Sequence, residues 1–296
     1  MIYATIDIGS NTTRLLAADT EGDQLRKVME QRAYTRIGKD VKKGKISAGK
    51  IAEVAEVCAT QLRLAEEVGA ESIRIVATAA VRDAKNSKQA VKEISRATGE
   101  AVEVLSEDEE GRLAFLGATK TLGYAVEGKV AVVDVGGGST EIVLGTVDGG
   151  VEKVRSVRVG TGYLAEELLE SDPPSPAEIR AVRDRVADLF EGVEVSQPDQ
   201  AVAVGGSASS LRKVVGAVLE YETLERAVRV LTGEPIADVA RMFELDPRRV
   251  EVLPAGVLIL EQLSQLLGQP LQIGKGGLRE GVLLDQLLGG ATPAAA

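Results

Sequence analysis

The sequence contains two closely similar segments, Tyr3-Ala-Thr-Ile-Asp-Ile-Gly-Ser-Asn-Thr-Thr-Arg-Leu-Leu16 and Val130-Ala-Val-Val-Asp-Val-Gly-Gly-Gly-Ser-Thr-Glu-Ile-Val-Leu144. In each, an apolar run ends in an aspartate, an aliphatic residue and a glycine, then a small polar turn follows and a second apolar run leaves. Aliphatic and β-branched residues favour extended backbone, so each segment is predicted to form a β-hairpin. Because the pattern occurs twice, we infer a duplicated domain.

The turn of each hairpin is rich in glycine and small polar residues. Glycine adopts positive φ angles without steric cost, so such a turn can direct several backbone N–H groups at one anion, and hydroxyl and amide side chains add donors. The predicted phosphate-binding residues are Gly9, Ser10, Asn11 and Thr12 in the first turn and Gly136, Gly137, Gly138, Ser139 and Thr140 in the second. For one turn alone an ordinary hairpin is the better interpretation, but the matched pair favours phosphate.

Each hairpin also places one aspartate at the end of its first strand. A carboxylate beside a phosphate-binding turn is suited to hold Mg²⁺, which takes oxygen ligands and keeps several waters. We therefore predict that Asp7 and Asp134 bind the metal.

The length of 296 residues is enough for two domains. Strand-like and helix-like stretches alternate, which predicts an α/β class. The longest apolar runs, such as 257–260, are too short to span a membrane, and Asp7 interrupts the N-terminus before a signal-peptide core.

The single cysteine, Cys58, cannot form an internal disulfide, so we expect a cytoplasmic location. Cys58 lies on an apolar helical stripe, so we expect it to serve packing and not chemistry.

The chain contains no histidine. Serine–histidine triads, cysteine–histidine pairs and the usual zinc sites are therefore excluded, and acid–base work must fall to carboxylates, lysine, tyrosine or water. The net charge of −10 argues against nonspecific nucleic-acid binding, although a metal ion and a few arginines can still create a local site for an anion.

Further candidates follow other predicted strands. Strand 73–77 leads directly into Thr78 and Arg82, which places donors where open α/β sheets bind ligands. Arg82 is equally explained as a surface partner of Asp83. A third small-residue turn, Gly205-Gly206-Ser207, stands between a strand and a helix and is a weaker candidate for anion binding at a helix N-terminus.

Two glutamates are candidates for activating water. Ser106 and Glu109 fit a helix capping box, and acidic residues suit the first turn of a helix, so composition alone favours interpreting Glu110 as a charge of the cap region. Glu110 is nevertheless not needed for the cap. Glu141 follows the second turn and is expected to face the same site as Asp134, although a solvent-exposed strand residue is the competing interpretation.

Six motifs together resemble the exopolyphosphatase and guanosine pentaphosphate phosphohydrolase family. They are Asp7-Ile-Gly-Ser-Asn-Thr12, Ala77-Thr-Ala-Ala-Val-Arg-Asp-Ala84, Glu109-Glu110, Asp134-Val-Gly-Gly-Gly-Ser-Thr-Glu141, Gly205-Gly-Ser-Ala-Ser209 and Gly277-Leu-Arg-Glu-Gly281. The resemblance implies two ribonuclease-H-like domains of the actin, sugar kinase and Hsp70 type around a central cleft. We place the N-terminal domain at residues 1–117 and the C-terminal domain at 118–296.

The resemblance also implies an activity, namely Mg²⁺-dependent hydrolysis of the terminal phosphate of inorganic polyphosphate, with K⁺ as a second candidate cation and a homodimer as the assembly. Glu110 and Glu141 would activate the attacking water, Asp7 and Asp134 would hold the metal, and Arg82 would hold substrate charge. Tyr163 stands where the family commonly has an arginine, a departure that would alter how substrate is held. The longer relatives carry extra C-terminal domains that grip distant polymer, and without them we expect limited processivity.

Three alternatives remain open from the sequence. A guanosine pentaphosphate (pppGpp) 5′-phosphohydrolase needs the same site as an exopolyphosphatase. A kinase of the actin fold needs an adenosine pocket near the third turn and leaves Glu110 and Glu141 unexplained. A non-catalytic sensor of polyphosphate or alarmone binds without releasing phosphate.

Overall fold

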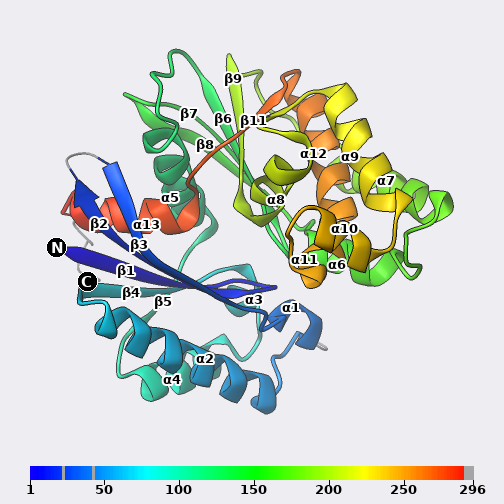
Figure 1. Cartoon of the computed structure of the whole chain (residues 1–296). Helices are drawn as coiled ribbons and strands as arrows, with labels where there is room; N and C mark the ends of the chain where they lie inside the picture. The colour runs from blue at the N-terminus through cyan, green and yellow to red at the C-terminus, as the bar shows by residue number, and fades with distance from the viewer. Residues whose placement is uncertain (22–23, 42–43, 290–296) are drawn as a thin grey trace. The chain divides into compact units, whose positions relative to one another are not determined.

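The computed structural model describes residues 1–21, 24–41 and 44–289. The chain divides into two compact units (Figure 1). Unit 1 comprises Met1–Thr121 and the C-terminal segment from Gly276, and unit 2 comprises Leu122–Lys275. Within the described residues, no helix has the length and apolar character needed to cross a membrane.

Unit 1 is built on a five-stranded sheet of order β3-β2-β1-β4-β5. Strands β1, β2 and β3 form an antiparallel meander, and β4 and β5 continue the sheet parallel to β1. The elements are β1 (Ile2–Ile8), β2 (Thr13–Glu21), β3 (Gln24–Ala33), α1 (Ile37–Asp40), α2 (Ala48–Glu67), β4 (Ala70–Ala77), α3 (Ala79–Arg82), α4 (Ser87–Thr98), β5 (Val102–Val104), α5 (Glu107–Lys120) and α13 (Leu278–Leu287).

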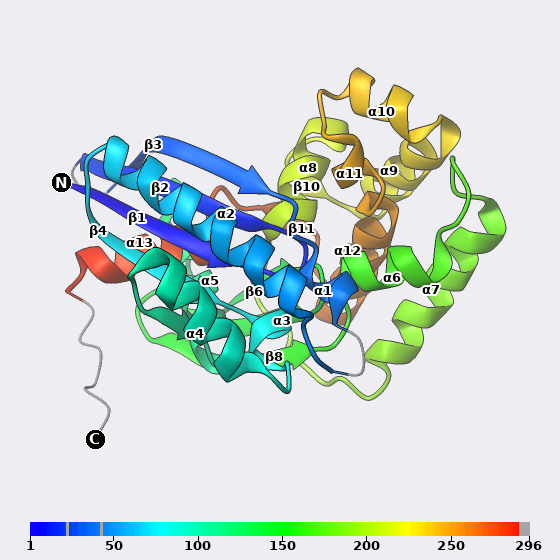
Figure 2. The ribbon, with the colours of Figure 1, turned by 90° about the horizontal axis from the view of Figure 1, so that it is seen from below.

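Helices cover both faces of this sheet, so a strand such as β4 directs apolar side chains toward both faces. Side chains alternate along a strand, so Ile75 of β4 joins the core under α2 and α4, while Val76 joins a second core under α5 and α13. Figure 2 shows α2 and α4 side by side on one face. The predicted stripe of α2, including Cys58, is buried in this core.

Unit 2 repeats the arrangement with one extra strand, in the order β10-β11-β9-β6-β7-β8. Strands β6, β7 and β8 are antiparallel, and β9 and β11 continue parallel to β6. The elements are β6 (Val130–Val135), β7 (Thr140–Thr146), β8 (Gly150–Val157), α6 (Thr161–Leu168), α7 (Pro176–Phe190), β9 (Gln200–Val204), α8 (Gly205–Val215), β10 (Val218–Leu219), α9 (Tyr221–Gly233), α10 (Ile236–Met242), α11 (Pro247–Val250), α12 (Leu253–Leu267) and β11 (Leu271–Ile273). Helix α12, whose first two turns are wholly apolar, is buried in the core of this unit.

The two sheets share one topology. An antiparallel three-stranded meander is followed by two parallel strands, with β1 and β6 at equivalent central positions. Both predicted hairpins therefore occur at the same place in their unit. The predicted α/β class with a duplicated domain is confirmed.

The division of the chain differs from the expected one at its C-terminal end. We expected residues 118–296 to form one domain, but α13 packs against α5 in unit 1. The reason is a close contact between backbones: a Cβ atom on Gly117 would lie 1.9 Å from the carbonyl oxygen of Gly277, and one on Gly281 would lie 1.8 Å from that of Leu113. Gly117 of α5 and Gly281 of the C-terminal motif thus allow the last helix to pack closely in the first unit.

Candidate active site

Both hairpin turns are closed by the same hydrogen bond. In the first, the N–H of Gly9 donates to the carbonyl oxygen of Thr12 at 3.0 Å, and in the second, the N–H of Gly136 donates to that of Ser139 at 3.0 Å. The equal spacing of donor and acceptor shows that the sequence repeat is also a repeat in backbone geometry.

The first turn is held from outside by the segment at α1. The carbonyl oxygen of Ser10 accepts from the N–H of Gly38 at 2.8 Å, and that of Asn11 accepts from the N–H of Arg36 at 2.9 Å. A trans peptide directs its N–H opposite to its C=O. The N–H groups of Asn11 and Thr12 therefore point away from α1, as an anion-binding turn requires.

The second turn is held in the same way by the N-terminus of α6. The carbonyl oxygen of Gly136 accepts from the N–H of Thr161 at 3.0 Å, and that of Gly137 accepts from the N–H of Gly162 at 3.0 Å. The N–H groups of Gly137 and Gly138 consequently point away from α6. Each turn thus has two outward-facing N–H groups, and the pair in the second turn lies one position earlier in the repeat than the pair in the first.

The contact with α6 leaves no room for a side chain at Gly160. A Cβ atom there would lie 2.3 Å from the backbone of both Gly137 and Gly138. The hydroxyl of Thr140, which we predicted as a phosphate donor, donates to the carbonyl oxygen of Val159 at 2.7 Å and is fully buried. Its observed contact is therefore with the backbone that leads to α6.

Asp7 lies opposite Arg14 in the pairing of β1 with β2. Its Oδ1 atom is buried and has no hydrogen-bond partner among the described residues. Burial raises the pKa of this carboxyl above its ordinary value, although the nearby guanidinium groups of Arg279 and Arg14 act in the opposite direction. A buried carboxylate oxygen without a donor has the character of a cation ligand.

Asp134 takes the equivalent position in unit 2, where Glu141 lies opposite it in the pairing of β6 with β7. The Glu141 side chain is buried, 3% exposed, and accepts from the hydroxyl of Ser156 at 3.0 Å. A Cβ atom on Gly205 would lie 2.4 Å from Oδ1 of Asp134, so the turn between β9 and α8 lies directly against this carboxylate. The two predicted acidic residues of unit 2 are thus neighbours.

Arg82 and Glu110 form a close ion pair. Nη1 of Arg82 donates to Oε2 of Glu110 at 2.6 Å and to the carbonyl oxygen of Leu105 at 3.0 Å. The carboxylate of Asp83, the alternative partner considered from the sequence, is 3.7 Å away. Burial alone would lower the pKa of Arg82, but its hydrogen bond and charge contact with Glu110 raise it above its ordinary value. Glu110 itself is only 8% exposed.

The first turn of α5 explains why Glu110 is free of a capping role. The hydroxyl of Ser106 accepts from the N–H of Glu109 at 3.2 Å, as predicted. The Glu109 carboxylate binds Arg112 at 2.8 and 2.9 Å, so it completes an ion pair in place of the second half of the predicted capping box. Glu110 points to a different partner, Arg82.

Hydrogen bonds between strand ends bring the predicted residues of unit 1 to one edge of the sheet. The N–H of Thr78 donates to the carbonyl oxygen of Ile8 at 3.2 Å, and the N–H of Leu105 donates to the carbonyl oxygen of Ala77 at 3.0 Å. The carboxyl ends of β1, β4 and β5 therefore meet. This edge carries the first turn, Thr78 and the pair formed by Arg82 with Glu110, and it is the edge where open α/β sheets bind ligands.

The third small-residue turn lies against Arg249, a residue that the sequence did not identify as part of the site. Gly205 has a φ of 88°, and a Cβ atom on Gly206 would lie 2.7 Å from the guanidinium of Arg249. Arg249 comes from α11 and is buried. Ser207 lies in the first turn of α8, with a buried hydroxyl that has no hydrogen-bond partner among the described residues. Nothing near Arg249 in the sequence signals this contact.

A family model for the Ppx/GppA phosphatase family matches residues 16–289. The chain belongs to this family. Exopolyphosphatase 1 of Mycobacterium tuberculosis is 30% identical over 97% of the chain and 88% of that protein, and exopolyphosphatase 2 of the same species is 29% identical over 95% and 96%. The expected enzyme class, a hydrolase of phosphoanhydride bonds, is confirmed at the level of the family.

Solved structures of Ppx/GppA proteins share this fold. The Aquifex aeolicus family member superposes with a TM-score of 0.81 at 30% identity, covering 98% of the chain and 99% of that structure. An exopolyphosphatase from Cytophaga hutchinsonii has a TM-score of 0.85 at 18% identity, covering 98% of each, and supports the fold alone. The predicted fold class, two ribonuclease-H-like domains of the actin type, is confirmed.

Proposed function

We propose that this Ppx/GppA protein is a Mg²⁺-dependent exopolyphosphatase, which releases orthophosphate from the end of inorganic polyphosphate. The observation that carries the proposal is the pair of matched turns, each with backbone N–H groups directed outward and an aspartate at its base. A polyanion with regularly spaced phosphates suits repeated donors of this kind. The names of the mycobacterial relatives support the same substrate.

The residues divide the work of phosphoryl transfer to water. That reaction requires mainly positioning and charge stabilisation. The turns at 9–12 and 136–140 bind phosphate oxygens, and Thr78, Arg82 and the turn at 205–207 add donors. Glu110 and Glu141 orient the attacking water and accept its proton. The new P–O bond forms as the bond from the terminal phosphorus to the bridging oxygen breaks, and the shortened chain leaves with that oxygen.

Asp7 and Asp134 suit a Mg²⁺ ion that shares its coordination with substrate and water. The buried Oδ1 of Asp7 lacks a donor, and the described residues contain no group of three or more acidic, histidine or cysteine side chains that would form an all-protein site. Mg²⁺ usually binds through one or two carboxylates plus phosphates and waters. When bound, it would neutralise phosphate charge. K⁺ is the second cation to be tested.

The decisive experiment measures phosphate release from polyphosphate, pppGpp and ATP in parallel, with and without Mg²⁺ and K⁺. We expect polyphosphate to be the preferred substrate and activity to require Mg²⁺. Glu110→Gln should lower kcat by about two to four orders of magnitude, the usual contribution of a positioned acid–base group. The matched control is Asp108→Asn, because Asp108 is an exposed acid in the same helical turn.

The outcomes separate the remaining functions. Preference for pppGpp would assign the guanosine pentaphosphate phosphohydrolase activity, and tight binding of polyphosphate without phosphate release would assign a sensor. Equal rates for wild type and Glu110→Gln would remove Glu110 from the mechanism. We also propose a cytoplasmic homodimer, for which light scattering of the purified full chain and fractionation of expressing cells are the tests.

A further inference from the structure

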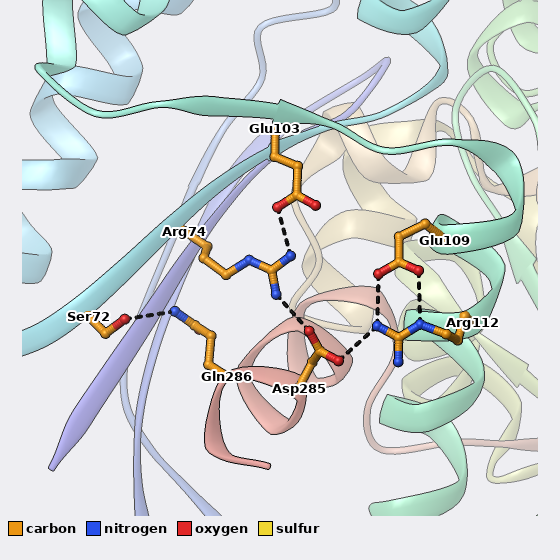
Figure 3. A network of polar contacts seen from close by, with 7 residues as sticks. All are labelled: Ser72, Arg74, Glu103, Glu109, Arg112, Asp285 and Gln286. Atoms are coloured by element: carbon orange, nitrogen blue, oxygen red, sulfur yellow. Dashed lines mark hydrogen bonds and ion pairs between the residues drawn. The ribbon is translucent and has the colours of Figure 1, made fainter. Parts of the chain in front are cut away.

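One carboxylate of the last helix joins the strand that leads to Arg82 with the helix that carries Glu110. Oδ1 of Asp285 in α13 accepts from Nη2 of Arg112 in α5 at 2.8 Å, and Oδ2 accepts from Nη1 of Arg74 in β4 at 2.9 Å. Figure 3 shows Asp285 between the two guanidinium groups. β4 and α5 are therefore bridged through a single side chain.

Both arginines have their orientation fixed by a second partner. Arg112 makes a bidentate contact with Glu109, and Arg74 donates to Glu103 of β5 at 2.7 Å. The side chains of Asp285 and Arg74 are 17% and 23% exposed, so their contact is less screened than a surface ion pair. Arg112 is 43% exposed, so its contact with Asp285 depends more on the bidentate bond to Glu109 that fixes the guanidinium. The bridge therefore restrains its neighbours more firmly than two isolated surface contacts would.

The bridge complements the glycine contact between the same two helices. Where Gly117 and Gly281 meet, backbone contact sets the separation of α5 from α13. Arg112 lies nearer the first turn of α5, on a different side of the helix from Glu110. Asp285 thus restrains the end of α5 where Glu110 meets Arg82, and it does so relative to β4, whose carboxyl end leads to Arg82.

We propose that Asp285 is a positioning residue for Glu110. By binding β4 and α5 together, it sets the spacing between the strand that leads into α3 with Arg82 and the helix that carries Glu110, and so holds the Glu110 carboxylate where it orients water. This inference rests on the role of Glu110 in the proposed function. Asp285 acts through Arg112 and touches neither water nor substrate in this role.

The test replaces Asp285 by asparagine, which keeps the shape and removes the charge. We expect Asp285→Asn to lower kcat for polyphosphate by about tenfold or more with KM unchanged, because small misplacements of a reacting group cost rate more than binding. The matched control is Gln286→Ala. Gln286, the next residue of α13, hydrogen bonds to Ser72 of β4 at 3.2 Å (Figure 3) and should be replaceable with less than a twofold change in kcat.

A double-mutant comparison separates positioning from simple destabilisation. In a Glu110→Gln background, Asp285→Asn should cause no further loss of the residual rate, whereas a merely structural role lowers the rate equally in both backgrounds. Arg112→Gln breaks the α5 arm of the bridge, together with the contact to Glu109, and leaves the bond between Asp285 and Arg74 in place. It should reproduce the effect, so the proposal remains testable if the Asp285 variant folds poorly. Unchanged kcat in both variants, or equal losses in both backgrounds, would overturn the proposal.

Failure of the proposed substrate would be visible separately. If the wild-type chain releases phosphate from pppGpp and not from polyphosphate, the exopolyphosphatase assignment fails, and the same variants measured with pppGpp still decide the role of Asp285. A protein that binds these compounds and hydrolyses none of them would overturn both proposals.

Discussion

Arg82 and Glu110 face each other at 2.6 Å, and the same Nη1 atom of Arg82 also binds the carbonyl oxygen of Leu105. One guanidinium thus contacts both Leu105, which lies just before α5, and Glu110 in the first turn of α5. A planar guanidinium can serve two acceptors at fixed angles, which an ammonium group on a flexible chain does not reproduce. The pair is therefore both an electrostatic contact and a geometric restraint on Glu110.

Arg82→Lys should separate these two properties. The charge remains, but the fixed double contact is lost, so we expect kcat for polyphosphate to fall by about tenfold to a hundredfold. Arg96→Lys is the control, because Arg96 makes an exposed ion pair with Glu93 in α4 and should tolerate the change. Wild-type kinetics in Arg82→Lys would show that charge alone is sufficient.

Gly160→Ala should disrupt the second phosphate-binding turn. Its new Cβ would lie 2.3 Å from the backbone of Gly137 and Gly138, so the turn must move and its outward N–H groups with it. We expect activity to fall by about tenfold or more, with phosphate release from polyphosphate as the assay. Gly233→Ala in the same unit meets no atom within 4 Å and should leave the rate unchanged. Equal rates in the two variants would contradict this account.

The features that the sequence predicted best are local ones. The hairpins at Asp7 and Asp134 formed as expected because strand propensity and turn residues act over a few neighbouring positions. The sequence also predicted the cap of α5, because the hydroxyl of Ser106 accepts from the N–H of Glu109 only three residues away. A repeat in sequence then implied a repeat in topology.

The features that the sequence did not show depend on distant segments. Glu109 and Glu110 are adjacent and chemically identical, yet one binds Arg112 within its own helix and the other binds Arg82 from a preceding segment. The return of α13 to unit 1 depends on a backbone contact at Gly117 that no local pattern signals. Arg249 reaches the turn at Gly206 only because α11 is placed there by the surrounding core.

Cys58 should be chemically inert in the folded protein. Burial raises the pKa of its thiol to about 12, and the attacking species in alkylation is the thiolate. At pH 8 we expect no labelling by iodoacetamide over the time in which the urea-unfolded chain is labelled completely, as followed by mass spectrometry. Rapid labelling of the native protein would mean that α2 opens readily or that the stripe containing Cys58 is not packed.

Glu30 should contribute to stability at neutral pH and lose that contribution in acid. Burial alone would raise its pKa, but Arg279, Arg14 and a hydrogen bond from Lys27 outweigh burial and lower the pKa to about 2. Its ion pairs with Arg14 and Arg279 are 2.6 and 2.9 Å long. Glu30→Gln leaves these two arginines without their shared carboxylate, so we expect a loss of about 1–2 kcal/mol in the free energy of unfolding at pH 7, allowing for partial exposure.

The sign of the pH effect follows from the direction of the shift. A carboxyl whose folded pKa lies below its unfolded value of 4.5 stabilises the fold above pH 4.5, and this stabilisation disappears as the pH falls through 2. The difference between wild type and Glu30→Gln in urea unfolding should therefore be full at pH 7 and shrink toward pH 2. Glu53→Gln removes an exposed ion pair with Lys50 and should show little difference at any pH. A difference for Glu30→Gln that stays constant with pH would show that the variant acts through packing and not through the charge of Glu30.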